Sequence, residues 1–235
     1  MTTRPLPALW SALVAPILKA IQAGRGQTAL VGLSGSAKGF LLSTLSRQFA
    51  GSGPSLLIVT PTDETAERLH ADAAFFHRLQ GVPSEDVLLF PDWGVLPYTA
   101  APPPVEVVGQ RMQVLERLRQ PKSGLVVIVP VTAFLQRLLP RSILSEAVFT
   151  LTASTVIART PLIVRFLQLG YRQVSVVENP GEFAVRGGIV DLFSTGQTEP
   201  HRIEFLGDTV ETLGARILEA EHKLYPEALQ QVLAR

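Results

Sequence analysis

The 235-residue sequence contains no cysteine. This absence excludes disulfides, thiolate nucleophiles and cysteine-ligated zinc, and it is the composition expected of a protein from a reducing cytoplasm. Long apolar runs are also lacking. The run "GLVVIVPVTAFL" at 124–135 is among the longest, and it falls well short of the ~18 to 20 residues that a membrane-spanning helix needs. We therefore expect a cytoplasmic chain without a membrane span.

A charge excess of one sign is missing as well. The chain has 21 Lys and Arg against 20 Asp and Glu, with a formal net charge of +1. Such a balance does not indicate a nucleic-acid binder that acts through a basic surface. The hydrophobic fraction of 46% argues against disorder, and the length allows one large or two small domains. The four histidines do not cluster, since His70 and His77 are two turns apart on one predicted helix, so no metal site is predicted.

Apolar runs and helical patterns alternate in the first part of the chain. Four runs are predicted as buried strands, at 28–33, 55–60, 86–90 and 124–131. Between them, helical patterns occupy 38–50, 63–80 and 105–120. Alternation of this kind is typical of a mostly parallel sheet covered by helices. An amphipathic helix between Trp10 and Ile21 precedes it, and we favour this helix over an export signal. The sequence thus predicts an α/β domain over residues 1–147.

The pattern changes from about Val148. The stretch "AVFTLT" at 147–152 is predicted as a strand and 160–169 as a helix. Closely spaced strands then follow in "QVSVVE", "EFAVRGGIVDLF" and "HRIEFLGDTVETL". This order predicts a small α+β domain with an antiparallel sheet over residues 148–215. Residues 216–235 are expected to form a divergent tail.

The stretch "GLSGSAKG", Gly32 to Gly39, lies where a phosphate-binding loop would join a strand to a helix. The P-loop pattern is G-x-x-x-x-G-K-[ST], whose final hydroxyl ligates Mg²⁺. Gly32, Gly35 and Lys38 are present, but Ala37 replaces the second glycine of the pattern and Gly39 replaces the hydroxyl. We therefore expect a degenerate Walker A loop and no cofactor. Weak residual binding of ATP or phosphate through Lys38 is the alternative.

A second acidic motif that would complete a nucleotide-hydrolysing site is not evident. No predicted strand ends in the Asp-Glu pair that holds Mg²⁺ and orients water. Asp63 and Glu64 directly follow "IVTPT", and they are predicted to open a helix for which Thr62 or Asp63 is the N-cap. The residues thus favour a chain without catalytic activity.

Five motifs occur in an order that resembles a known family. They are "GLSGSAKG", "FPDWGVLPY" (90–98), "GQRMQVLERL" (109–118), "VIVPVTAFLQRLLP" (127–140) and "GEFAVRGGIVDLF" (181–193). In this order the chain resembles the N-terminal part of bacterial transcription-repair coupling factors, which is itself similar to the excinuclease helicase UvrB. The motif resemblance ends at about Leu213. It implies a P-loop, RecA-like parallel-sheet domain with a degenerate Walker A motif, followed by a small domain that binds the excinuclease ATPase UvrA.

The resemblance also implies roles for single residues. Arg186 and Arg202 match arginines that bind UvrA from an exposed sheet surface. Phe205 and Leu206 stand where the family pattern has two aromatics, so an apolar contact is expected but the second aromatic anchor is lost. From the residues alone, Arg186 has the alternative of pairing with Glu182 or Glu204 across strands.

The expected function is a non-catalytic module that recruits the excinuclease protein UvrA in transcription-coupled nucleotide-excision repair. The polymerase-binding and DNA-translocating domains of the family would be supplied elsewhere. The alternative is a DNA-dependent nucleotide-hydrolysing, helicase-like protein similar to UvrB.

Direct DNA contact is expected to be weak or absent. Trp93, Pro97 and Tyr98 are interpreted as a packed loop, with a base-stacking platform as the alternative. Arg111 and Arg117 share a predicted helix with acidic residues, and they are expected on a solvated face.

Overall fold

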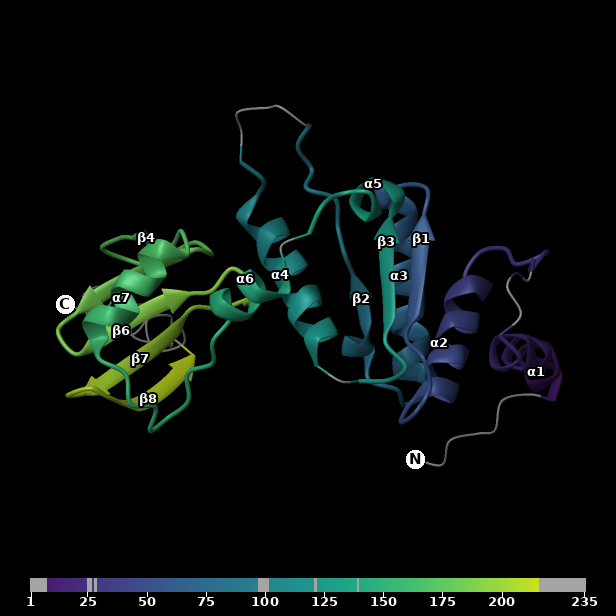
Figure 1. The fold of residues 1–235 in the computed structure, drawn as a ribbon, viewed down its shortest axis with the longest axis horizontal. Helices are drawn as coiled ribbons and strands as arrows, with labels where there is room; N and C mark the ends of the chain where they lie inside the picture. The colour runs from purple at the N-terminus through teal and green to yellow at the C-terminus, as the bar shows by residue number, and fades with distance from the viewer. Residues whose placement is uncertain are drawn as a thin grey trace, which may run out of the picture. The chain divides into compact units, whose positions relative to one another are not determined.

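The computed structural model describes residues 8–24, 27, 29–96, 102–120, 122–138 and 140–215. The chain divides into two compact units, the first made of residues 1–103 and 110–138 and the second of residues 104–109 and 139–235. Each unit has its own sheet and its own hydrophobic core, and both sheets are visible in Figure 1. The predicted tail, 216–235, lies outside the described residues.

The first unit contains a three-stranded parallel sheet. Its strands are β1 (Leu56–Thr60), β2 (Val87–Leu89) and β3 (Val126–Pro130), in the order β1-β3-β2. Every residue of the central strand β3 is buried. This explains its uninterrupted apolar sequence, since a strand covered on both faces has no polar side. The strands predicted at 55–60, 86–90 and 124–131 are therefore confirmed.

Helices cover this sheet on both sides. They are α1 (Ala8–Gln22), α2 (Ala37–Phe49), α3 (Asp63–Leu79) and α4 (Val105–Arg119), with the short helices η1 (Ser84–Asp86) and α5 (Val131–Phe134). The side chain of Thr62 accepts a hydrogen bond from the Thr65 N–H at 3.2 Å, which confirms Thr62 as the N-cap of α3. Among the helices that the structure describes, none combines the length and the hydrophobicity of a membrane span.

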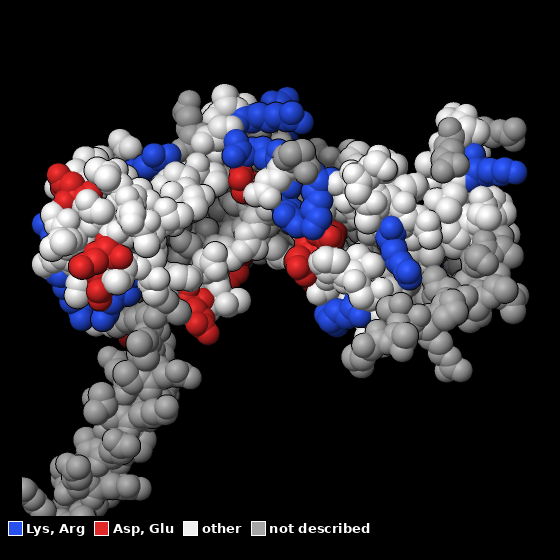
Figure 2. All heavy atoms as spheres, turned by 90° about the horizontal axis from the view of Figure 1, so that it is seen from below, with Lys and Arg blue, Asp and Glu red and all other residues white. Residues whose placement is uncertain are grey.

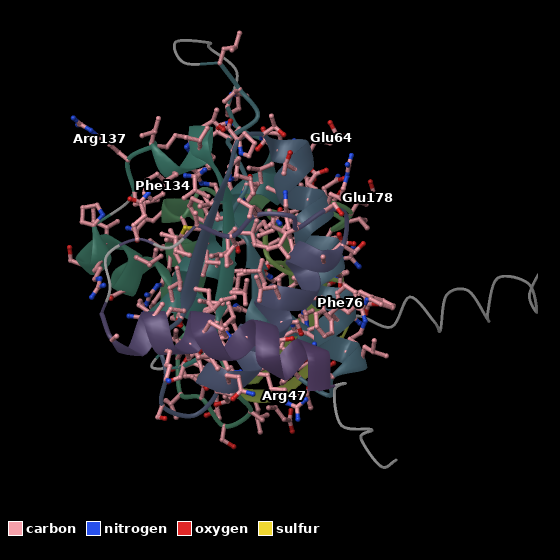
Figure 3. The ribbon with its side chains drawn as sticks, turned by 90° about the vertical axis from the view of Figure 1, so that its right-hand side faces the viewer. Arg47, Glu64, Phe76, Phe134, Arg137 and Glu178 are labelled. Carbon is pink, nitrogen blue, oxygen red and sulfur yellow. The ribbon has the colours of Figure 1, made fainter. Side chains whose placement is uncertain are left out.

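The core of the first unit is layered. Ala66 and Ala73 of α3 pack with Val126 and Ile128 of β3 on one face of the sheet. On the other face, Val114 of α4 packs with Val127 and Val129 of β3. A further cluster joins α1 to α2, so α2 lies between α1 and α3 (Figure 1). Figure 3 shows the two sides of the unit, with Phe76 and Glu64 of α3 opposite Phe134 and Arg137.

The strand predicted at 28–33 is wrong. The described residues 29–33 adopt no regular secondary structure, and Leu30 and Val31 are 47% and 92% exposed. Gly32 has a φ of +82°, which interrupts an extended backbone. An apolar run becomes a buried strand only when a neighbouring strand pairs with it, and 29–33 pairs with none of β1, β2 and β3.

The second unit contains a five-stranded sheet in sequence order. Its strands are β4 (Arg172–Gln173), β5 (Glu182–Arg186), β6 (Ile189–Phe193), β7 (His201–Leu206) and β8 (Thr209–Ala215). Strands β5 to β8 are antiparallel, as predicted, but β4 pairs in parallel with β5. The sheet is therefore mixed rather than antiparallel. The loop at 174–181 separates β4 from β5 and returns the chain so that both strands run in the same direction.

In its described residues from 140 to 215, this unit has the helices α6 (Arg141–Ala147) and α7 (Arg159–Gln168). Leu162 and Phe166 of α7 pack on Phe183, Val190 and other apolar residues of the sheet, so α7 covers one of its faces. The strand predicted at 147–152 is wrong, since residues 148–152 are an irregular segment. Its apolar residues are used for packing instead, because the Phe149 ring stacks on that of Phe166 at a centroid distance of 6.3 Å.

The first turn of α4 contributes to the second unit. The backbone of Gly109 lies so close to the backbone oxygen of Thr195, which follows β6, that a Cβ at this position would overlap with it. Only glycine allows such an approach of two backbones. Val105 contacts Gly181 at the same end of the sheet, where Gly181 has a φ of +86°. These contacts explain why residues 104–109 group with the second unit.

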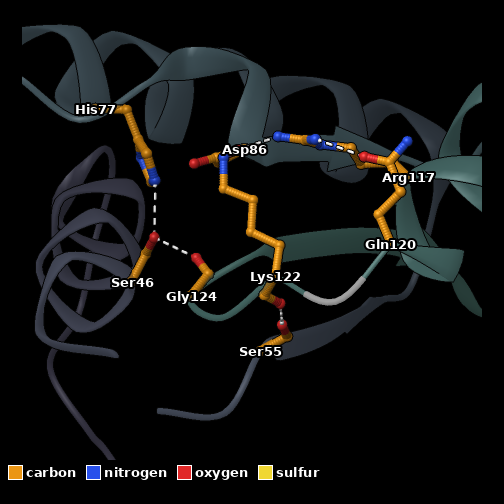
Figure 4. A network of polar contacts seen from close by, with 8 residues as sticks. All are labelled: Ser46, Ser55, His77, Asp86, Arg117, Gln120, Lys122 and Gly124. Atoms are coloured by element: carbon orange, nitrogen blue, oxygen red, sulfur yellow. Dashed lines mark hydrogen bonds and ion pairs between the residues drawn. The ribbon is translucent and has the colours of Figure 1, made fainter. Parts of the chain in front are cut away.

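A buried polar network ties the helices of the first unit to its sheet (Figure 4). His77 of α3 is fully buried, with Nδ1 2.9 Å from the Ala73 oxygen and Nε2 3.0 Å from the hydroxyl of Ser46. That hydroxyl lies 2.5 Å from the Gly124 oxygen, just before β3. Burial lowers the pKa of the His77 imidazole, although the hydrogen bond to Ala73 and the charge of Asp86 act in the opposite direction. His77 is therefore neutral in the folded state near pH 7.

This neutral histidine predicts acid sensitivity. Because its pKa is lower in the folded chain than in the unfolded one, the unfolded state takes up a proton first as the pH falls below about 6.5. The contribution of neutral His77 to the free energy of unfolding is thus fully present above that pH, and it is lost progressively below it. We expect the free energy of unfolding, measured by urea titration between pH 7.5 and 5, to fall more steeply for the native chain than for His77→Gln. Equal slopes would contradict a neutral buried His77.

Candidate functional site

The loop at Gly32–Gly39 leads into the first turn of α2. Gly32 and Gly35 have φ values of +82° and +53°, conformations that glycine adopts without strain. Lys38 is exposed on the first turn of the helix. The Ala37 N–H, which a phosphate-binding loop would offer to its ligand, donates to the Ser34 oxygen at 3.2 Å. This N–H group is therefore already bonded within the loop, so the loop does not hold it open for a phosphate.

Gly39 occupies the position of the missing hydroxyl, and it is buried against α3. A Cβ at Gly39 would lie 2.6 Å from the Cβ of Asp72 and 2.9 Å from the backbone nitrogen of Ala73. Real Cβ atoms do not approach other atoms so closely. The space that a serine or threonine would fill is thus already occupied by α3, mostly by its backbone.

Metal-binding groups do not gather in the part of the chain that the structure describes. No group of three or more His, Asp or Glu side chains there is placed to hold an ion. His70 and His77 point to different partners, because His70 Nε2 lies 3.1 Å from the Val87 oxygen. Asp63 and Glu64 form the first turn of α3, as predicted.

The predicted solvated face of Arg111 and Arg117 is wrong. Arg111 is 2% exposed, and its guanidinium carbon lies 4.2 Å from the ring centroid of Phe90 and 3.9 Å from that of Trp93. Arg117 pairs with the buried carboxylate of Asp86 at 3.0 Å. Sequence spacing along a helix identified their nearest acidic neighbours, whereas tertiary packing selected other partners. Because Trp93 stacks on Arg111, the packed-loop interpretation holds for this residue; Pro97 and Tyr98 lie outside the described residues.

The second unit presents a sheet face that α7 does not cover. We call it the arginine face. Strand alternation and register define its members, which are Ala184, Arg186, Ile189, Asp191, Arg202, Glu204, Leu206, Thr209, Thr212 and, on an added edge, Val156. Arg186, Ile189 and Glu204 form one cross-strand row, and Ala184, Asp191 and Arg202 form the next. The two predicted arginines therefore share one face, in adjacent rows.

Arg202 is held by an ion pair within the sheet. Its Nε and Nη2 donate to the two carboxylate oxygens of Asp191 at 2.8 and 3.1 Å, a bidentate geometry. The Asp191 side chain is 2% exposed, while that of Arg202 is 38% exposed. Asp191 thus fixes the direction of the guanidinium, and Arg202 still reaches the surface.

Arg186 is exposed at the end of β5 and binds neither of the acidic residues proposed for it. Its Nη2 donates to the backbone oxygen of Ser175 at 2.6 Å. Glu204 accepts a hydrogen bond from the Thr212 hydroxyl at 2.6 Å. Glu182 is engaged by backbone N–H groups of residues 178 and 179 and by Arg172, and these lower its pKa to about 2. The bond to Ser175 uses one of the five N–H donors of Arg186.

Phe205 and Leu206 point to opposite faces of the sheet. Phe205 packs partly buried in the core beneath α7. Leu206 is 70% exposed and belongs to the arginine face. Of the two apolar residues predicted for partner contact, only Leu206 lies on the face of the arginines, in the row beyond Glu204.

Charged side chains do not form a continuous basic surface on the face of the molecule seen in Figure 2. Lys and Arg occur there in separate groups, interrupted by Asp, Glu and wide uncharged areas.

Two features of the arginine face were missed by sequence reasoning. Asp191, in "GGIVDLF", was not identified as the partner of Arg202. The sequence does show an acidic residue at an alternating position of the strand that precedes the strand of Arg202. Only the register, however, shows that Asp191 and Arg202 are opposite each other. Val156 was missed because the segment around it had no strand pattern of its own.

Comparison with known proteins gives one family match and several relatives. Residues 149–232 match the family model described as the UvrB interaction domain. A transcription-repair-coupling factor of Mycobacterium tuberculosis is 36% identical over 181 residues, and that of Escherichia coli is 29% identical over 200 residues. These alignments cover 74% and 85% of this chain but only 14% and 17% of the relatives. The chain thus spans a small part of the length of the curated relatives it matches.

Proposed function

This chain is a relative of the transcription-repair coupling factors, and its residues 149–232 belong to the UvrB interaction domain family; on that premise we propose that it is a non-catalytic module that recruits the excinuclease protein UvrA in transcription-coupled repair. The observation that carries the proposal is the arginine face. It offers two arginines in adjacent rows, one oriented by a buried carboxylate, and an exposed Leu206 on the same face.

The chemistry of this face suits an acidic partner surface. Guanidinium groups that are already oriented lose little side-chain entropy on binding, and they bind carboxylates through two parallel hydrogen bonds. Arg186 keeps free donor capacity, and Arg202 is partly exposed although it is paired. Other domains of a coupling factor, including a polymerase-binding domain and a DNA translocase, would act from elsewhere in the assembly.

For the first unit we propose a degenerate P-loop domain of RecA-like type that serves as a scaffold, binds no cofactor and is found in the cytoplasm. The parallel sheet, the glycine-rich loop before α2 and the exposed Lys38 support the fold. The close contact of Gly39 with α3 supports the absence of a hydroxyl ligand for Mg²⁺. The alternative, a DNA-dependent nucleotide hydrolase, would require both that ligand and an acidic pair at a strand end.

A calorimetric titration of the chain into the cognate UvrA tests the proposal. We expect saturable binding by the native chain and a loss of about 1 to 2 kcal/mol for Arg186→Ala, since truncation of an arginine at the centre of an interface costs this much or more. Arg68→Ala is the matched control, because Arg68 is 73% exposed and pairs locally with Glu64 of α3. An absence of binding by the native chain, together with DNA-stimulated ATP hydrolysis, would favour the hydrolase instead.

A further inference from the structure

The arginine face ends in an apolar row that no sequence motif indicated. Residues 154–157 add an edge to the sheet beside β8, where Val156 bridges to Thr209, and Thr209 pairs with Leu206. Directly paired residues of antiparallel strands have their side chains on the same face, about 5 Å apart. Leu206, Thr209 and Val156 therefore form one row across the sheet.

Val156 is the most exposed residue of this row. It is 79% exposed, while the next residue, Ile157, packs into the core beneath α7. Because Ile157 is anchored inward, strand alternation directs Val156 outward. Its exposure thus follows from a fixed backbone and does not reflect a loose segment.

The backbone before and after Val156 is hydrogen-bonded to residues 208–210, at the start of β8. The Ser154 N–H donates to the Val210 oxygen at 2.8 Å, and the Val210 N–H donates to the Thr155 oxygen at 2.9 Å. The Ile157 N–H donates to the Asp208 oxygen at 2.8 Å. A β-branched side chain on such a frame has little rotamer freedom to lose, so its burial by a partner is favourable.

We propose that Val156 is an affinity-determining contact of the surface that docks UvrA, and that the Leu206–Thr209–Val156 row receives an apolar side chain of that protein. The inference rests on the proposed function. The row continues the arginine face beyond Glu204, and it exposes the side chains of Leu206 and Val156 to solvent. Removing this apolar surface from water favours contact with an apolar side chain. The matching patch of the partner is therefore an apolar residue, with carboxylates further along the face, opposite the arginines.

Val156→Thr tests this with the shape of the side chain conserved. Threonine keeps the β-branch and suits an edge strand, so the thermal unfolding midpoint should be unchanged. We expect the dissociation constant for UvrA to rise about tenfold, and Val156→Asp to bind too weakly to detect. Val164→Thr is the matched control, because Val164 is 46% exposed on α7, away from the arginine face, and it should bind as the native chain does.

The outcomes separate the two levels of inference. If the native chain binds, Arg186→Ala weakens binding and Val156→Thr binds like the native chain, the role of Val156 is overturned and the proposed function stands. If the native chain itself does not bind, the proposed function is overturned, and the role of Val156 with it. Equal weakening of UvrA binding by Val156→Thr and Val164→Thr would also overturn the role of Val156, because the loss of affinity would then not depend on whether the valine lies on the arginine face.

Discussion

Replacing Arg202 by alanine is expected to abolish detectable binding to UvrA and to destabilise the second unit at the same time. Truncating one member of a desolvated charge pair at an interface costs ~2 to 5 kcal/mol of binding free energy. Within the fold, the same change leaves the Asp191 carboxylate, 2% exposed, without its bidentate partner. We expect a loss of about 2 kcal/mol in the free energy of unfolding, below the value for a fully buried pair because Arg202 is 38% exposed.

These two losses can be separated with a neutral pair. In the double variant Arg202→Gln with Asp191→Asn, an amide hydrogen bond replaces the ion pair, and no buried charge is left unpaired. We expect chemical denaturation to show that most of the lost stability returns, while calorimetry shows that binding does not. Recovery of binding along with stability would mean that Arg202 acts only as a support for Asp191.

Gly39→Ser is expected to destabilise the first unit without creating a nucleotide site. Its new Cβ would lie 2.6 to 2.9 Å from atoms of Asp72 and Ala73, two of the three being backbone atoms that no side-chain rotation can move. Overpacking of this kind costs ~1 to 3 kcal/mol, and the better helix propensity of serine offsets only a small part of it. Urea denaturation should show a net loss of about 2 kcal/mol.

Lys38→Ala is the control for this prediction, since it lies on the same helical turn and is exposed. We expect its stability to stay within ~0.5 kcal/mol of the native value. A stable Gly39→Ser variant that gains magnesium-dependent binding of ATP in a calorimetric titration would show that the hydroxyl position is open, and the scaffold proposal for this loop would then be wrong.

Elements with strong local signals were predictable from the sequence. The helix at 63–80 was found to within one residue, because Thr62, two acidic residues and a regular apolar spacing agree. The paired strands β5 to β8 followed from alternation and turn residues. The strand predicted at 28–33 is wrong because its apolar run is typical of a strand, although none of β1, β2 and β3 pairs with the described residues 29–33. Local pattern alone does not supply a pairing partner.

The sequence placed Arg186 and Arg202 in strands, as the structure has them, but it did not predict their surroundings. The motifs pointed to Arg186 and Arg202, but the partner of Arg202 depends on the register of β6 against β7. Arg111 shows the same limit, since its burial between Phe90 and Trp93 brings together residues from separate segments of the chain. Long-range packing decides such contacts, and helical spacing carries no information about it.

The close approach at Gly39 also determines how a nucleotide-binding loop could be rebuilt in this chain by directed evolution. The atoms that exclude a side chain there include the backbone of Asp72 and Ala73, so shortening the Asp72 side chain to alanine would leave every one of them in place. A library of single substitutions should therefore contain no variant that restores the hydroxyl at full stability. Recovery requires α3 to shift as a unit, and only coordinated changes along the contact between α2 and α3 would be selected.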